Sequence, residues 1–212
     1  MIYDFITNMY FTGMTHGGMI HLSRAKEPEV FRGFWLFFAL VSIPVSLLQY
    51  GLSEGYTPLR DTMKKYLEKK EGFDFENNEL FIVSGGQQCA DLTTKALVNE
   101  GDVVPTEEPA FVGCLNTFRS YGAKLVGIPM EQDGMNINAL EEALKANPDA
   151  KLLYTIPSFQ NPTGITTSLE KRKKVYELCC KYDIAILEDN PYGELRFAGE
   201  NVPTIKSMDT EG

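Results

Sequence analysis

The sequence predicts an α/β fold, with three layers in the order α/β/α around a mostly parallel sheet. From residue 80 onward, short apolar segments alternate with longer segments of helical periodicity, a pattern typical of parallel strands joined by crossover helices. One short segment, 184–187, is apolar throughout, as expected for a strand that helices cover on both faces. Such a sheet binds its ligands at the carboxyl ends of its strands.

The first predicted helix covers residues 57–71. Thr57 is expected to cap its N-terminus and Pro58 to take the first helical position, where a missing N–H costs nothing. Met63 and Leu67 recur at helical spacing and predict one buried stripe. Gly72 follows the last periodic residue and marks the end of the helix.

A glycine turn follows the next predicted strand. Residues 80–83 are expected to form that strand, which runs through Gly85 and Gly86 into a helix marked by Cys89 and Leu92. Backbone N–H groups at such a turn, together with the helix dipole, favour an anion, and a phosphate group is the natural ligand. A structural tight turn explains the two glycines equally well, because the residues match neither standard phosphate-binding motif.

The middle of the chain continues the alternation. A strand is predicted to begin at 102–105 and another to cover 124–129, with a helix over 111–121 between them. Asn138, with Glu141 three residues later, is expected to cap the next helix. This order of elements favours parallel strands with right-handed crossovers.

The last two predicted strands end in polar loops. A buried strand at 151–156 leads into the Asn-Pro loop 158–164, after which Thr167 and Glu170 are expected to form the capping box of a long helix. The strand at 184–187 ends in residues 188–192, which put carboxylates and a tyrosine at the carboxyl end of a central strand. Both loops occupy ligand-binding positions of an α/β sheet.

Composition narrows the classes of partner. The net charge is −9 without a dense basic patch, so no nucleic-acid partner is expected. The four cysteines lack C-x-x-C spacing and fit reduced thiols in a cytoplasmic protein, and the two histidines predict no metal site. The apolar run 34–48, about 15 residues long, is too short to span a membrane, so no membrane partner is expected.

Taken together, the loops resemble those of the class I and II aminotransferases, the pyridoxal-phosphate (PLP) enzymes of fold type I. The likeness covers residues 49 to about 206 and is greatest for the branch with 2-aminoadipate and kynurenine aminotransferases and the effector domains of MocR-type regulators. Its motifs, in the order of the family, are Gln49-Tyr50-Gly51 with Pro58-Leu59-Arg60, Ser84-Gly85-Gly86-Gln87-Gln88, Glu108-Pro109-Ala110-Phe111, Pro157 to Gly164, and Glu188-Asp189-Asn190-Pro191-Tyr192.

The resemblance implies a cofactor contact for each of seven residues. Gly86 and Gln87 would hold the phosphate, Phe111 would cover one face of the pyridine ring, Asn161 and Tyr192 would share its phenolic oxygen, Asp189 would pair with its nitrogen, and Tyr50 would reach the phosphate of a neighbouring subunit in a homodimer. A buried carboxylate beside the nitrogen keeps the ring protonated, so that it acts as an electron sink.

Structural roles stay open for single residues of this set. Asp189 can cap a turn, Tyr192 can belong to the core and Phe111 can be an ordinary helix hydrophobe. Their shared placement at strand ends is what favours a ligand site.

The resemblance also implies an activity and a division of the chain. It implies transfer of an amino group between an amino acid and a 2-oxo acid, with an atypical N-terminal segment 1–48 and an incomplete PLP-binding large domain 49–212 that lacks its C-terminal part and the small domain. The family's Schiff-base lysine is expected beyond Gly212, so no catalytic residue is assigned and the chain alone is expected to be inactive. Lys171 matches the S-x-x-K spacing, but it lies in the first turn of a predicted helix.

Two other interpretations remain open at this point. The chain can be the effector-domain fragment of a MocR-type transcriptional regulator, although residues 1–48 are too short and too apolar for a winged helix-turn-helix. It can also be a non-enzymatic remnant.

Overall fold

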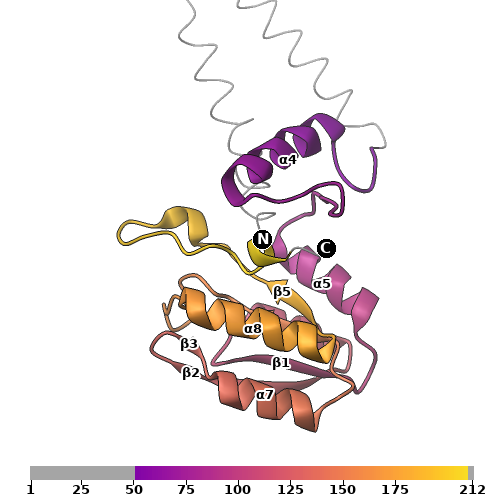
Figure 1. Cartoon of the computed structure of the whole chain (residues 1–212). Helices are drawn as coiled ribbons and strands as arrows, with labels where there is room; N and C mark the ends of the chain where they lie inside the picture. The colour runs from indigo at the N-terminus through magenta and orange to yellow at the C-terminus, as the bar shows by residue number, and fades with distance from the viewer. Residues whose placement is uncertain (1–50, 210–212) are drawn as a thin grey trace, which may run out of the picture.

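The computed structural model describes residues 51–209 and has a five-stranded sheet between two layers of helices (Figure 1). The segment 1–48 and Tyr50 lie outside the described residues. The strands are β1 (Val103–Glu108), β2 (Lys124–Glu131), β3 (Gly134–Met135), β4 (Leu152–Thr155) and β5 (Ala185–Glu188). The helices are α4 (Thr57–Glu71), α5 (Gly86–Leu97), α6 (Val112–Ser120), α7 (Ile137–Ala146) and α8 (Leu169–Tyr182), with short 3-10 turns η2 (Gly193–Leu195) and η3 (Lys206–Met208).

The strands lie in the order β3-β2-β1-β4-β5. β1 pairs in parallel with β2 and with β4, and β4 pairs in parallel with β5, while β2 and β3 form an antiparallel hairpin. The carboxyl ends of β1, β4 and β5 therefore meet at one edge of the sheet. The parallel pairing confirms the predicted crossover connections.

Each face of the sheet has its own core. On one face, α7 and α8 pack through Leu144 and Val175 against residues such as Leu153 of β4. On the other face, α5 and α6 pack through Ala90 and Phe118 against residues such as Val104, Leu152 and Tyr154. Neighbouring residues of β4 thus point into opposite cores, as the alternation of a strand requires. The predicted three-layer α/β/α fold is confirmed.

The predicted strand at 80–83 is wrong. Leu80 is buried with Met63 and Leu67 in a small separate cluster on α4, and the N–H of Ile82 donates to the carbonyl of Glu54 at 2.9 Å. Leu80 and Ile82 therefore pack against α4 and do not extend the sheet. Helix α4 ends at Glu71 as predicted, with Gly72 in the left-handed conformation, but Thr57 is its first residue and not its cap: Tyr56 takes the N-cap position, without a capping hydrogen bond from its side chain.

Two other predicted caps are also displaced, by one or two residues. Asn136, not Asn138, caps α7, because its side chain accepts a hydrogen bond from the N–H of Ala139. Ser168, not Thr167, caps α8, because its hydroxyl accepts from the N–H of Lys171. The side chain of Lys171 forms an ion pair with Asp133 at 2.7 Å on the β2–β3 hairpin.

The expectation for segment 184–187 is met only in part. In the described sheet β5 is an edge strand and not a central one, with Ala185 exposed and the other three residues half-buried, although Ile186 and Leu187 pack against the cores of opposite faces. On α5 the buried residues are Ala90 and Thr94, whereas Leu92 is 48% exposed. Within residues 51–209, none of the helices has both the length and the apolar character that crossing a bilayer requires.

Candidate cofactor site

Polar loops gather at the edge where the parallel strands end. One follows β1 and leads to Phe111, one follows β4 and contains Asn161, and one follows β5 and contains Asp189 and Tyr192. The glycine turn before α5 joins them through contacts with the start of α6. Six of the seven residues singled out in the sequence therefore lie around one end of the sheet, and Tyr50 lies outside the described residues.

The glycine turn has the geometry of a helix start. Gly85 precedes α5 with φ +85°, a left-handed conformation that glycine adopts without strain. Its carbonyl accepts the first helical hydrogen bonds, from the N–H of Gln88 at 3.1 Å and of Cys89 at 3.3 Å. Gly86 and Gln87 are thus the first two residues of α5, at the positive end of its dipole. An anion is favoured at this position.

Gln87 and Phe111 meet over Gly113. The side-chain amide of Gln87 donates to the carbonyl of Gly113 at 3.1 Å and also to the hydroxyl of Thr117. A β-carbon added to Gly113 would lie only 2.5 Å from the Phe111 ring and 3.0 Å from the Gln87 side-chain oxygen. Only glycine leaves room here, so the backbone of α6 fixes the ring and the amide relative to each other.

Asp189 is a buried carboxylate directly after β5. It is 9% exposed, and its Oδ2 accepts a hydrogen bond from the Tyr154 hydroxyl at 2.7 Å, with Cys114 Sγ at 4.0 Å. Its N–H donates to the carbonyl of Thr155 at 2.8 Å, which extends the pairing of β4 and β5 by one bond. Burial, and then the negative charge of Asp189, raise the pKa of Tyr154. Tyr154 therefore stays protonated and donates a hydrogen bond to the carboxylate.

Asn161 and Tyr192 come together from different loops. The amide nitrogen of Asn161 lies 3.4 Å from the hydroxyl of Tyr192, and both side chains are half-buried. The amide of Asn161 donates to the hydroxyl of Tyr192, so the two loops are joined at this point. The predicted proximity of these two residues is present, whereas their roles toward a cofactor remain a proposal.

A buried glutamate and glutamine were missed by the sequence analysis. Glu107 Oε1 accepts from the Thr155 hydroxyl at 2.5 Å and from the N–H of Ile156 at 3.1 Å, and its Oε2 accepts from Gln160 at 3.0 Å. Burial raises the pKa of Glu107, while these hydrogen bonds oppose the shift. Both residues are 1% exposed. The pair connects the end of β1 to the Asn-Pro loop across 53 residues of sequence.

A buried arginine on α8 anchors the start of the Asn-Pro loop. The Arg172 guanidinium donates to the carbonyl of Pro157 at 2.7 Å and to the hydroxyl of Ser158 at 3.0 Å. It also donates to the carbonyls of Thr167 and Pro203, each at 3.0 Å. Arg172 is fully buried, and burial lowers its pKa. No signal in the sequence distinguished it from the exposed basic residues beside it.

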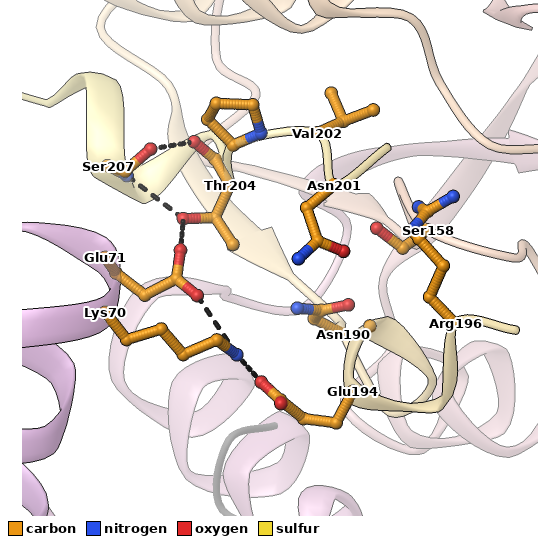
Figure 2. A pocket seen from close by; sticks show the side chains of 12 residues that line it. Lys70, Glu71, Ser158, Asn190, Glu194, Arg196, Asn201, Val202, Thr204 and Ser207 are labelled. Atoms are coloured by element: carbon orange, nitrogen blue, oxygen red, sulfur yellow. Dashed lines mark hydrogen bonds and ion pairs between the residues drawn. The ribbon is translucent and has the colours of Figure 1, made fainter. Parts of the chain in front are cut away.

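A polar cavity of about 400 Å³ lies beside the Asn-Pro loop (Figure 2). Lys70 at the end of α4 forms ion pairs with Glu194 and, at 3.4 Å, with Glu71. Glu71 in turn accepts a hydrogen bond from Thr204 at 3.4 Å. On the opposite wall the Arg196 guanidinium stacks on the ring of Phe159, 4.7 Å from its centroid. The contacts of Lys70 with Glu194 and of Glu71 with Thr204 link α4 to the segments that follow β5.

Between residues 51 and 209, no three His, Cys, Asp or Glu side chains are placed to hold a metal ion. A family model, described as aminotransferase class I and II, matches residues 25–210 of the chain. The chain belongs to this family. Class I and II aminotransferases depend on PLP, which agrees with the cofactor expected from the sequence.

Individual relatives are similar over most of the chain. Aromatic-amino-acid aminotransferase 1 of Thermococcus litoralis is 41% identical over 169 residues, and 2-aminoadipate transaminase of Thermus thermophilus is 35% identical over 164 residues; the matches cover 78% and 77% of this chain and 40% of each relative. The crystal structure of Pyrococcus horikoshii kynurenine aminotransferase with PMP superposes with a TM-score of 0.77 and 38% identity, over 87% of this chain and 46% of that one.

The chain spans about 40% of the length of the curated relatives it matches. A regulator is also similar: the probable rhizopine catabolism regulatory protein MocR of Rhizobium meliloti is 32% identical over 166 residues, which cover 78% of this chain and 33% of the regulator. The family therefore holds both enzymes and regulators that share this part of the fold.

Proposed function

We propose that this chain binds PLP at the carboxyl ends of β1, β4 and β5, and that the protein to which it belongs is an aminotransferase. The observation that carries the proposal is the buried carboxylate of Asp189, held by Tyr154 at the end of β5. When bound, PLP supplies an electron sink for the carbanion formed at the substrate Cα.

The neighbouring residues offer groups that match the remaining parts of the cofactor. Gly86 and Gln87 stand at the start of α5, where an anion such as the phosphate is favoured. Phe111 provides a flat apolar surface for the pyridine ring, held in place by the lack of a side chain at Gly113. Asn161 and Tyr192, 3.4 Å apart, offer hydrogen-bond donors to one oxygen.

The finer parts of the proposal rest on the family. The substrates are an amino acid and a 2-oxo acid, and the protein works as a cytoplasmic homodimer in which Tyr50 contacts the phosphate of the partner subunit. Residues 49–212 form an incomplete PLP-binding large domain, and residues 1–48 form an atypical N-terminal segment. The lysine that would carry the cofactor is not assigned in this chain, so the chain alone binds PLP and does not turn over substrate.

A regulatory role is the second candidate, because a MocR-type regulator is 32% identical to the chain. Both candidates require the same cofactor site. Assays of amino-group transfer by the longer protein separate them: transfer from an amino acid to a 2-oxo acid supports the enzyme, and cofactor binding without transfer supports the regulator.

Calorimetric titration of the chain with pyridoxamine 5′-phosphate tests the cofactor site without requiring a lysine. Asp189→Asn is expected to weaken binding by about thirtyfold or more, because the pyridinium nitrogen loses a buried charged partner. Asp149→Asn makes the same change at an exposed position and should bind as the parent chain does. Absence of binding by the parent chain, or equal binding by both variants, would contradict the proposal.

A further inference from the structure

Gln160 uses its whole side-chain amide to join two loops. Its nitrogen donates to Glu107 Oε2 at 3.0 Å and to the carbonyl of Pro109 at 2.7 Å. Its oxygen accepts from the N–H of Thr163 at 2.9 Å and from the Thr163 hydroxyl at 2.6 Å. A primary amide has two N–H donors and two acceptor sites, so every hydrogen-bonding position of this side chain is filled.

The surroundings of Gln160 require an amide. On one side it faces two acceptors, the carboxylate of Glu107 and the carbonyl of Pro109, and on the other side it faces two donors of Thr163. A glutamate presents no hydrogen to the acceptors, and an apolar side chain presents nothing to either side. Since Gln160 is 1% exposed, water cannot replace a lost bond without opening the loop.

The two loops that Gln160 joins carry different parts of the candidate site. Pro109 lies two residues before Phe111, and Asn161 is the next residue after Gln160. Glu107 is held from the other side by Thr155 and Ile156 at the end of β4. A rigid path therefore runs from the Phe111 ring to the Asn161 amide through a single buried side chain.

We propose that Gln160 is a positioning residue that fixes Asn161 relative to Phe111, so that the two can hold one flat ligand together. This inference rests on the proposed function, since that ligand is the cofactor. Gln160 itself does not contact the ligand. Its partners leave no free donor or acceptor on its amide, so its effect on binding acts through the two loops.

The replacement Gln160→Glu tests the proposal through pH. It sets a second carboxylate 3.0 Å from that of Glu107, and Asp189 is a further negative charge that acts on Glu107. Two carboxylates at this distance share a proton when the pH is lowered, and the proton restores a donor between them. Binding of pyridoxamine 5′-phosphate should be about tenfold weaker than for the parent chain at about pH 8 and within about threefold of it at about pH 5.5.

Gln132→Glu is the matched control, because it makes the same chemical change in the exposed turn between β2 and β3. The parent chain and this control set the reference at each pH, so the effect of pH on the ligand itself cancels. The double variant E107Q/Q160E exchanges the two groups, and its amide at 107 can again donate to a carboxylate at 160. It should recover at least about half of the lost binding free energy at about pH 8.

The outcomes separate the inference from the function on which it rests. If the parent chain does not bind the ligand, the proposed function fails. If the parent chain binds and Q160E binds equally at both pH values, or stays equally weak at both, the positioning role is wrong. If Q160E does not fold, the double variant decides: binding close to the control supports the role, and a folded double variant without binding, or one that is unfolded at both pH values, overturns it.

Discussion

The hydroxyl of Tyr154 gives the sharpest test of how the site is built. Tyr154→Phe removes one oxygen, the donor that lies 2.7 Å from Asp189 Oδ2, and leaves the ring. That ring is fully buried and packs edge-on against Phe118 with centroids 5.4 Å apart, so the packing of the core is retained. Any change in stability therefore reports on the hydrogen bond to the carboxylate.

The expected loss at neutral pH is about 2 kcal/mol of unfolding free energy, the usual contribution of a buried hydrogen bond to a charged group. The size of the loss depends on pH. Burial and the charge of Asp189 raise the pKa of Tyr154 above its ordinary value, so the folded chain keeps a proton that the unfolded chain releases near about pH 10.

The sign of the pH effect follows from these proton counts. Above about pH 10 the unfolded state binds fewer protons than the folded state, so the unfolding free energy falls by up to about 1.4 kcal/mol per pH unit from this residue. Phenylalanine has no proton to lose. The difference between the parent chain and Tyr154→Phe should therefore shrink as the pH rises above about 10.

Urea unfolding followed by circular dichroism at about pH 7.5 and about pH 11 measures both effects. Tyr121→Phe is the control, because its hydroxyl donates to Asp91 at 2.9 Å near the surface and its loss should cost much less. The reasoning is refuted if Tyr154→Phe is as stable as the control, or if its deficit is the same at both pH values.

Three further predictions concern the surroundings of the site. Arg172→Met should lower the unfolding free energy in urea by at least about 3 kcal/mol, because several buried carbonyls lose their donor, while the exposed neighbour Lys173→Met should have little effect. Gly113→Ala should push the Phe111 ring away, lower the unfolding free energy by about 1–3 kcal/mol and weaken pyridoxamine 5′-phosphate binding in calorimetry. After treatment with PLP and borohydride, mass spectrometry should find no lysine modified in stoichiometric amount; a single such adduct would show that the chain contains the cofactor lysine.

Most of the fold follows from local patterns, and the failures have physical causes. The helices and the four strands that pair in parallel have apolar residues at the spacing typical of each kind of element, so the sequence alone predicts them. The strand predicted at residues 80–83 is absent because a short apolar segment packs equally well on a helix or in a sheet. The burial of Leu80 against α4 depends on tertiary contacts, which the local sequence does not specify. The cap residues were predicted wrongly because two suitable residues lie within one or two positions of each other at each helix start. These are Asn136 and Asn138 at α7, and Thr167 and Ser168 at α8.

The candidate site likewise contains residues that the sequence predicted and residues that it did not. Loops such as the Asn-Pro loop are visible because their residue types are unusual at strand ends. The sequence did not predict the burial of Glu107, Gln160 and Arg172. A charged or amide residue is expected to be exposed unless its hydrogen-bond partner is known. The pairs Arg172–Ser158 and Gln160–Glu107 join residues 14 and 53 positions apart, and no local pattern encodes such a pairing.

The small cluster of Met63, Leu67 and Leu80 is separate from both cores of the sheet, and it has a consequence for the cooperativity of folding. The ion pair of Lys70 with Glu194 and the hydrogen bond from Thr204 to Glu71 join α4 to the segments after β5, and added salt weakens such charged contacts. Amide hydrogen exchange in α4 should therefore proceed through an opening that leaves β1 and β4 protected, with a lower free energy at high salt. Equal protection of α4 and the strands would show that the chain opens as one unit.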